Sequence, residues 1–232
     1  MAPSSTTLPA SVPVVNPAIV NLFADQNSRG KLVGTIKRDL IIKHSKTVAD
    51  LLEANPGMSD IEIRDASKGP LEHVINMIKD GKPPLKIGVS REPFAKAVAI
   101  LQAVIALDVQ PAQPQVEGHI VYTITQHKIT AAHVDVIERA SARLGTDCRI
   151  YKAMVQAVAY NVVHCNFTAE EQKAIKDVAL KSPALNTAIQ EKVDDLKRRN
   201  EAHKQLLAEK KAREDARQKR WKENEVYRQY LI

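Results

Sequence analysis

Residues that interrupt regular structure are concentrated in the first two-thirds of this 232-residue chain. All eight glycines lie at or before Gly145, and eleven of the twelve prolines lie at or before Pro114. The last 87 residues contain a single proline, Pro183, and are rich in alanine, glutamate, lysine, glutamine and leucine. Because these residues favour helices and helix breakers are missing, this part of the chain is predicted to be a run of helices.

The first part of the chain carries strand signals. Residues 18–24 and 31–36 are mostly apolar and flank residues 25–30, whose Asp, Asn and Gly side chains are typical of a turn. This pattern predicts a β-hairpin. Residues 60–64 alternate charged and apolar side chains, which predicts a third strand with both of its isoleucines facing inward.

Two helices are expected after the third strand. Pro70 suits the first position of a helix and Gly81 suits its C-terminal cap. The apolar face between them comprises Leu71, Val74, Ile75 and Ile78. A second helix is predicted with Ser90 as its N-cap. The stripe expected to be buried on it comprises Phe94, Val98, Leu101 and Ile105.

Residues 115–126 fit two structures. Ile120, Tyr122 and Ile124 alternate as in a strand, whereas the breakers Pro114 and Gly118 leave room for a short helix, which we favour. Three further helices are predicted from apolar periodicity and capping residues. The first of them begins at Thr130, and the second carries an apolar stripe from Tyr151 to Val162. The third begins at Thr168, where Glu171 completes a capping box.

Residues 36–45 (IKRDLIIKHS) resemble the strand-to-helix signature of BTB/POZ domains, in which an extended segment leads into His-Lys-Asp-Leu-Leu and a later serine. Asp39, Leu40 and Ser45 match that signature residue for residue. The predicted third strand and the two helices that follow it occur in the family's order. The resemblance covers residues 18–127, about half of the chain.

The sequence departs from the family where Lys37, Val48 and Lys79 replace its usual His, Phe and Tyr. The resemblance implies a protein-interaction domain, homodimeric or an adaptor to larger assemblies, that catalyses no reaction. We expect Leu40, Ile41 and Val48 at a self-association surface, although these side chains equally fit a core. The same residues also fit a simpler interpretation, a hairpin followed by an amphipathic helix with Asp39 near the helix N-terminus.

The tail of the chain carries most of its positive charge. Residues 191–232 hold 13 Lys or Arg and 9 Asp or Glu, a net +4 of the total +7. Its apolar stripe spans only the start, which predicts one long helix that is docked at its start and solvated at its end. That stripe comprises Leu185, Ile189, Val193 and Leu196. The candidate phosphate contacts are the clustered basic residues Lys197, Arg198, Arg199, Lys210, Lys211, Lys219 and Arg220.

Three of the nine aromatic residues, Trp221, Tyr227 and Tyr230, lie near the end of the chain. Since large aromatic side chains gain little from exposure to water, they predict a docking segment for another protein. Folding back onto the same chain is the alternative. The acidic residues among the basic clusters likewise fit a plainly solvated helix.

No motif for metal, nucleotide or catalysis is present. The seven histidines and two cysteines show neither CxxC nor HExxH spacing, and the glycines fit neither a P-loop nor a dinucleotide fingerprint. We therefore expect no catalytic residue, no metal and no cofactor. Cys148 and Cys165 are expected to be buried apolar side chains. No apolar run reaches the roughly 18 residues of a membrane span.

The sequence predicts an α+β fold in four segments. These are a disordered arm at 1–17, a BTB/POZ-like domain with a small sheet covered by helices at 18–127, a helical extension at 128–182, and a long charged helix at 183–232. The expected function is a non-enzymatic interaction or scaffold protein of the nucleus or cytoplasm. Its domain would serve self-association, as a homodimer, or adaptor binding, and its helix would dock other subunits, with no membrane involved. The alternative is a nucleic-acid-associated protein that binds the phosphate backbone through its basic helix.

Overall fold

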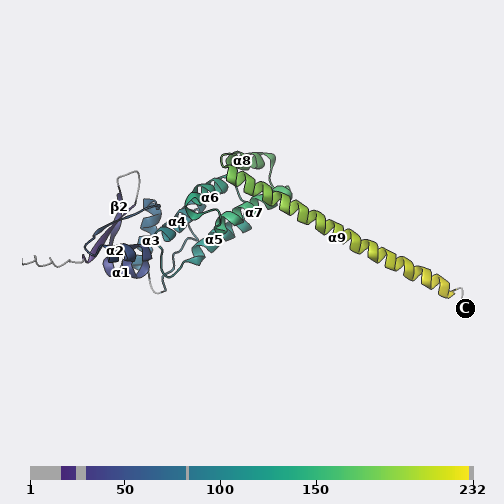
Figure 1. Cartoon of the computed structure of the whole chain (residues 1–232), viewed down its shortest axis with the longest axis horizontal. Helices are drawn as coiled ribbons and strands as arrows, with labels where there is room; N and C mark the ends of the chain where they lie inside the picture. Colours follow the sequence, from purple (N-terminus) through teal and green to yellow (C-terminus); the bar gives the residue numbers. More distant parts are fainter. Residues whose placement is uncertain (1–16, 25–29, 82–83, 230–232) are drawn as a thin grey trace, which may run out of the picture. The chain divides into compact units, whose positions relative to one another are not determined.

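The computed structural model describes residues 17–24, 30–81 and 84–229, with side chains up to Trp221. The chain is α+β, with a small three-stranded sheet followed by many helices (Figure 1). It divides into two compact units. Unit 1 comprises Met1–Lys128 and Asp135–Tyr151, and unit 2 comprises Ile129–Val134 and Lys152–Ile232.

The sheet of unit 1 has the strand order β2-β1-β3. Strands β1 (Ile19–Ala24) and β2 (Lys31–Lys37) pair antiparallel, which confirms the predicted hairpin, although residues 25–29 of its turn lie outside the described residues. Strand β3 (Asp60–Ile63) pairs with β1 in parallel. Strand β3 therefore forms one edge of the sheet, and one of its sides has no neighbouring strand in this order.

Alternate residues of β1 and β3 are buried, as expected for strands with one covered face. Leu22 of β1 and both isoleucines of β3, Ile61 and Ile63, are at most 2% exposed, which confirms the inward direction predicted for that strand. Asp60 and Glu62 point to the opposite, exposed face. Helix α3 (Lys68–Asp80) contacts β1 and β2 and buries the apolar face predicted for it.

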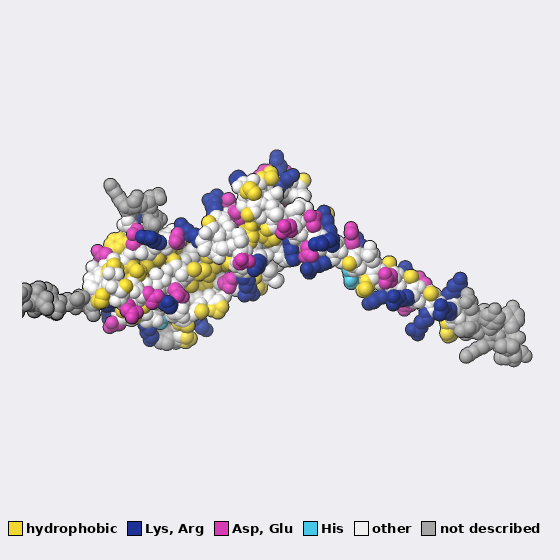
Figure 2. All heavy atoms as spheres, viewed as in Figure 1, with side chains coloured by type: hydrophobic (Ala, Val, Ile, Leu, Met, Phe, Trp, Pro, Cys, Tyr) yellow, Lys and Arg dark blue, Asp and Glu magenta, His cyan; other side chains and the backbone are white. Residues whose placement is uncertain are grey.

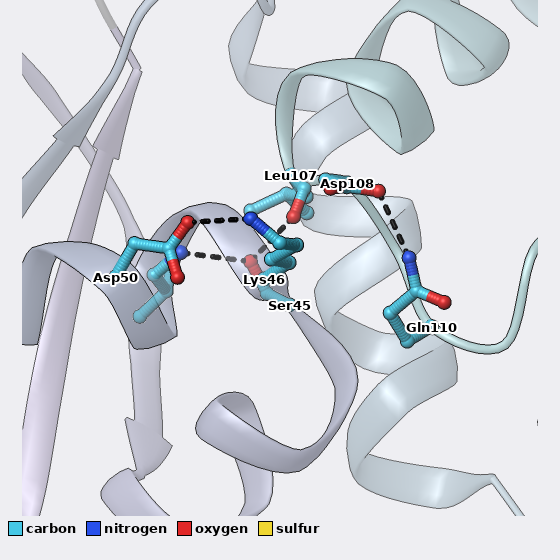
Figure 3. A network of polar contacts seen from close by, with 7 residues as sticks. Ser45, Lys46, Asp50, Leu107, Asp108 and Gln110 are labelled. Atoms are coloured by element: carbon cyan, nitrogen blue, oxygen red, sulfur yellow. Dashed lines mark hydrogen bonds and ion pairs between the residues drawn. The ribbon is translucent and has the colours of Figure 1, made fainter.

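Two short helices follow the hairpin, and a break at Ser45 separates them. Helix α1 (Arg38–His44) ends and helix α2 (Lys46–Ala54) begins where Ser45 adopts an extended backbone. The Ser45 hydroxyl accepts a hydrogen bond from the Val48 N–H and donates one of 2.6 Å to the Leu107 carbonyl (Figure 3). The fully buried Ser45 side chain therefore caps α2 and also links it by a hydrogen bond to the end of the fourth helix.

The same junction carries further main-chain bonds. The N–H of Lys46 donates to the Asp108 carbonyl, and the N–H of Gln110 donates to the His44 carbonyl. Lys46 also forms an exposed ion pair of 2.9 Å with Asp50 (Figure 3). The hydrogen bond from Lys46 to Asp50 and the negative charge of Asp50 raise the pKa of the Lys46 ammonium group.

A buried arginine joins α2 to the segment before β3. Arg38 is 9% exposed, and its guanidinium donates to the carbonyls of Leu52 and Met58. The last carbonyls of a helix lack hydrogen-bond partners within that helix, so a cation placed there can donate to them. Its positive charge also interacts favourably with the helix dipole. Arg38 thereby fixes the path of the chain into β3.

The boundaries of α3 differ in detail from the expectation. The helix begins at Lys68, so Pro70 lies within its first turn, where a proline is tolerated because the early N–H groups have no helical partner. Gly81 is the C-cap, but with φ of −66° it does not use the left-handed conformation. A Cβ at Gly81 would lie 2.6 Å from the Met77 carbonyl oxygen, so close approach explains the glycine.

Helix α4 (Phe94–Ala106) corrects two predictions. It begins at Phe94 after Pro93, not at an N-cap on Ser90. Ile105, assigned to the buried stripe, is 54% exposed. Val98 and Leu101 of the predicted stripe are buried and Phe94 is half-buried. The other buried side chains of α4 are Ala97, Ile100, Ala103 and Val104.

Helix α5 (Pro114–Gln126) confirms the favoured helical interpretation of residues 115–126. Its buried side chains Val116, Ile120 and Ile124 recur every four residues, while Tyr122 is exposed. Just before α5, the Gln113 side-chain amide donates to the Leu85 carbonyl and its oxygen accepts from the Ile87 N–H. That buried amide thus holds the extended segment before α4 as a neighbouring strand would.

The remaining helices match the predicted run. They are α6 (Ala131–Leu144), α7 (Arg149–Val163), α8 (Ala169–Ala179), which starts with the expected capping box at Thr168 and Glu171, and α9 (Pro183–Gln229). In α9, Leu185 and Val193 are buried and every described side chain from Lys197 to Trp221 is exposed. The long helix is therefore docked at its start and solvated beyond, as predicted.

The Ser45 junction leads to a stability prediction. Replacing Ser45 with alanine removes a buried donor and a helix cap, so we expect the free energy of unfolding to fall by about 1 to 3 kcal/mol. Urea denaturation followed by circular dichroism measures this change. Ser67→Ala is the matched control, because Ser67 also precedes a helix but its side chain makes no capping hydrogen bond. Equal effects of the two substitutions would contradict the importance of the junction.

Candidate protein-interaction site

A groove of about 960 Å³ lies in unit 1 along strand β3. Its walls come from α2, the end of α4 and the last turn of α6. All of its lining residues belong to unit 1. They are Thr47, Leu51, Met58, Asp60, Ile61, Glu62, Ile63, Arg64, Asp65, Gln102, Ile105, Ala106, Ala142, Arg143 and Leu144.

Part of the groove lining is apolar and accessible. Ile105 is more than half exposed, Ala142 is exposed, and Leu51 and Met58 are half-buried. A second hollow of about 440 Å³ shares Ile105 with the groove and extends the apolar surface along α4. Covering a solvent-exposed isoleucine beside a hollow with another apolar side chain is favourable, because it removes apolar surface from water.

The edge of the groove formed by β3 is charged. Asp60 and Glu62 lie on the exposed face of β3, and the Asp60 carboxylate accepts a hydrogen bond of 2.6 Å from the Asn21 amide. At the other end, Arg143 of α6 donates to the Asp65 carbonyl at 2.8 Å and lies 3.4 Å from the Asp65 carboxylate. Asp65 has a φ of 66°, so the chain turns sharply shortly after β3 ends at Ile63.

The main chain of β3 has hydrogen-bonding groups on the side of the groove. The Asn21 N–H donates to the Ser59 carbonyl. In a parallel ladder, alternate residues of a strand face the same neighbour, so Ile61 and Ile63 also direct their main-chain groups toward β1. The N–H and C=O groups of Asp60 and Glu62 therefore face the groove.

The structure places the predicted self-association residues mainly in the core. Ile41 and Val48 are fully buried, so they stabilise unit 1 and supply no surface while it keeps this fold. Leu40 is half-buried. This outcome is the core alternative for Ile41 and Val48, and its reason is that α1 packs against β2, α3 and α2.

The predicted residues of the tail lie on the exposed part of α9. Trp221 is 64% exposed, whereas the Tyr227 side chain and Tyr230 lie outside the described residues. The seven candidate phosphate contacts are all exposed: Lys197, Arg198, Arg199, Lys210, Lys211, Lys219 and Arg220. Figure 2 shows that dark blue Lys and Arg side chains outnumber magenta acidic ones along this helix.

One acidic residue neutralises part of the first basic cluster. Asp195 lies 3.0 Å from Arg199 and 3.4 Å from Lys192. Partial desolvation opposes the ionisation of Asp195, but the hydrogen bonds and charges of Lys192 and Arg199 together hold the pKa of its carboxyl group below the usual value. The clusters at Lys210 and Lys219 lie further along the helix.

The cysteines differ from the expectation of buried apolar side chains. Cys148 is half-buried and Cys165 is exposed, and both are free thiols. Helix α7 ends at Val163, so Cys165 lies in the following turn with a φ of 54°. Among the described residues, no group of three or more His, Cys, Asp or Glu side chains is placed to hold a metal ion.

Comparisons with family models, curated proteins and solved structures find no match for this chain. In the part of the chain that the structure describes, no helix combines the length and apolar character needed to cross a membrane. The groove itself was missed at the level of sequence. Its signals were the acidic alternation of β3 and the isoleucine at position 105, whose exposure depends on where α4 starts and what packs on it.

The exposed part of α9 yields the second prediction. A chain that ends after Leu196 loses no described buried side chain, so we expect its free energy of unfolding to change by no more than about 1 kcal/mol. Thermal unfolding of the shortened and full-length chains measures the difference. A loss of several kcal/mol would show that the distal part of α9 packs against the rest of the protein.

Proposed function

We propose that this protein is a non-enzymatic interaction or scaffold protein that binds other proteins through unit 1. The observation that carries the proposal is the groove beside the free edge of β3, with the exposed Ile105 in its wall. Apolar contact in such a hollow supplies affinity, while charged residues at its rim set orientation.

The order of elements supports the BTB/POZ-like character of unit 1. A hairpin leads into two short helices, then a strand parallel to β1, and then helices α3 and α4. This is the order that the resemblance at residues 36–45 implies. Ser45, one of the residues that match the family, is also the buried residue that joins α2 to the end of α4.

Helix α9 suits a second contact with other subunits. Its exposed part carries Leu206 and Leu207, each 50% exposed, as well as Trp221. At 1.5 Å per residue, the 47 residues of α9 extend about 70 Å. A helix of that length presents side chains to partners far from its docked end, which suits a scaffold.

The proposal is tested by capturing partners with the full-length chain in its native cell extract, followed by mass spectrometry. Wild type and Leu180→Glu should retain the same partners, and Ile105→Glu should lose a defined subset of them. Leu180 is a matched control because it is 59% exposed and belongs to unit 2. Absence of any specific partner, together with a monomer in light scattering, would refute an interaction function through unit 1.

The second candidate function is association with nucleic acid. The specific observation in its favour is the excess of positive charge on residues 197–220, which hold ten Lys or Arg and four Asp or Glu. All of their side chains are exposed. Basic residues on one helix release counterions from phosphates, which gives affinity that ignores sequence and falls with salt.

This alternative predicts that the chain binds a nonspecific duplex at about 50 mM salt and releases it by about 200 mM. Replacing Lys210 and Lys211 with glutamine should lower the slope of log K against log salt by about 0.9 for each phosphate that the helix no longer neutralises. Fluorescence anisotropy measures both effects. The matched control replaces Lys173 and Lys176, two exposed lysines of α8. No binding at low salt would exclude this function for α9.

A further inference from the structure

We propose that the groove accepts an extended segment of a partner protein as a fourth strand on β3, and that this segment alternates basic and apolar residues. The inference deepens the proposed function and rests on it. It is carried by three features of the groove: the main-chain groups of β3, the apolar wall opposite them, and the two carboxylates on the exposed face.

The main chain of β3 offers a template for strand addition. Asp60 and Glu62 direct their N–H and C=O groups to the groove, because the alternate residues Ser59, Ile61 and Ile63 face β1. An added strand would bond with those groups and would cover the open edge of the sheet. Arg143 closes one end by bonding Asp65, so the pairing is limited to the four residues of β3.

The apolar wall defines one set of side chains in the added strand. Side chains of a strand alternate between two faces. Those on the inner face of the added strand would lie over the half-buried Leu51, the exposed Ile105 and the neighbouring Ala106. Aliphatic residues at alternate positions therefore fit the groove.

The carboxylates define the other set. Asp60 and Glu62 are two residues apart on the exposed face of β3, and no ion pair involves either of them within the described residues. Directly opposite cross-strand side chains lie within about 5.5 Å of each other, so opposite charges there are favourable. Lysine or arginine at alternate positions of the added strand fits this face.

The same charges argue against a second copy of β3 as the occupant. Pairing two β3 strands would bring Asp60 and Glu62 of one copy next to those of the other, and like charges across strands are destabilising. The chain as a whole carries +7, so it repels a basic segment at long range. Attraction must therefore come from the local carboxylates and the pairing itself.

The test uses the full-length chain and a fluorescein-labelled peptide, acetyl-Lys-Ile-Lys-Ile-Lys-amide, in anisotropy titrations. We expect saturable binding, and weaker binding by about tenfold or more for the peptide with Glu in place of Lys. In the protein, Glu62→Lys should weaken binding of the lysine peptide by about the same factor, and Glu62→Gln should weaken it less. Glu72→Lys, on the exposed surface of α3, should leave binding within about twofold. Circular dichroism checks that each variant is folded.

Methylated peptides distinguish strand addition from loose electrostatic contact. N-methylation of one alternate set of amides should abolish binding and methylation of the other should not, because only one set faces β3. Loss of binding when the main-chain amides of the lysines are methylated indicates an antiparallel strand. Loss of binding when those of the isoleucines are methylated indicates a parallel strand. Equal effects of the two sets, or binding that survives both Glu62→Lys and Ile105→Glu, would overturn the inference.

The outcome is separable from that of the proposed function. If Ile105→Glu removes cellular partners but no peptide binds, the occupant chemistry is wrong and the interaction function stands. If Ile105→Glu removes no cellular partner and no peptide binds, the proposed function of the groove and the strand addition are both refuted. Saturable binding that depends on Glu62, Ile105 and one set of peptide amides supports the inference.

Discussion

The buried hydroxyl of Ser45 is the contact on which the arrangement of unit 1 depends. It donates to the Leu107 carbonyl and accepts from the Val48 N–H, so it joins the last turn of α4 to the first turn of α2. The N–H groups of Lys46 and Thr47 donate to the carbonyls of Asp108 and Leu107, directly after α4. A buried donor and several helix-end groups are satisfied together, which makes alternative packings of α2 on α4 costly.

This junction also determines the shape of the groove. Thr47 and Leu51 on one wall belong to α2, and Ile105 and Ala106 on the other are the two residues of α4 directly before Leu107. Arg38 sets the third side, because its bonds to Leu52 and Met58 direct the chain into β3. The α2, α4 and β3 sides of the groove are thus positioned by two buried polar side chains, Arg38 of α1 and Ser45 between α1 and α2.

Local sequence patterns predicted those parts of the fold in which the buried face of a helix or strand can be identified from that element alone. The hairpin, the inward isoleucines of β3 and the apolar face of α3 follow from alternation or helical periodicity within a few residues. Ile105 could not be placed in this way, because helical spacing identifies a face but not how far along the helix neighbouring elements cover it. Ile41 and Val48 fitted both a core and a surface, and only the packing of α1 against β2, α3 and α2 decides between them. The groove arises from α2, α4, α6 and β3 together, so no single stretch of sequence announces it.

The charges on β3 have a physical consequence for the choice of partner. A free edge strand exposes main-chain groups that any extended chain can use, and proteins limit such pairing with charged side chains. On β3 these are Asp60 and Glu62, whereas the solvated part of α9 is strongly basic. Carboxylates at the edge disfavour pairing between copies of β3 but leave its main chain open to a segment of opposite charge. Asp60 and Glu62, which disfavour pairing between two copies of β3, are therefore also the residues that favour a basic segment in the proposed strand addition.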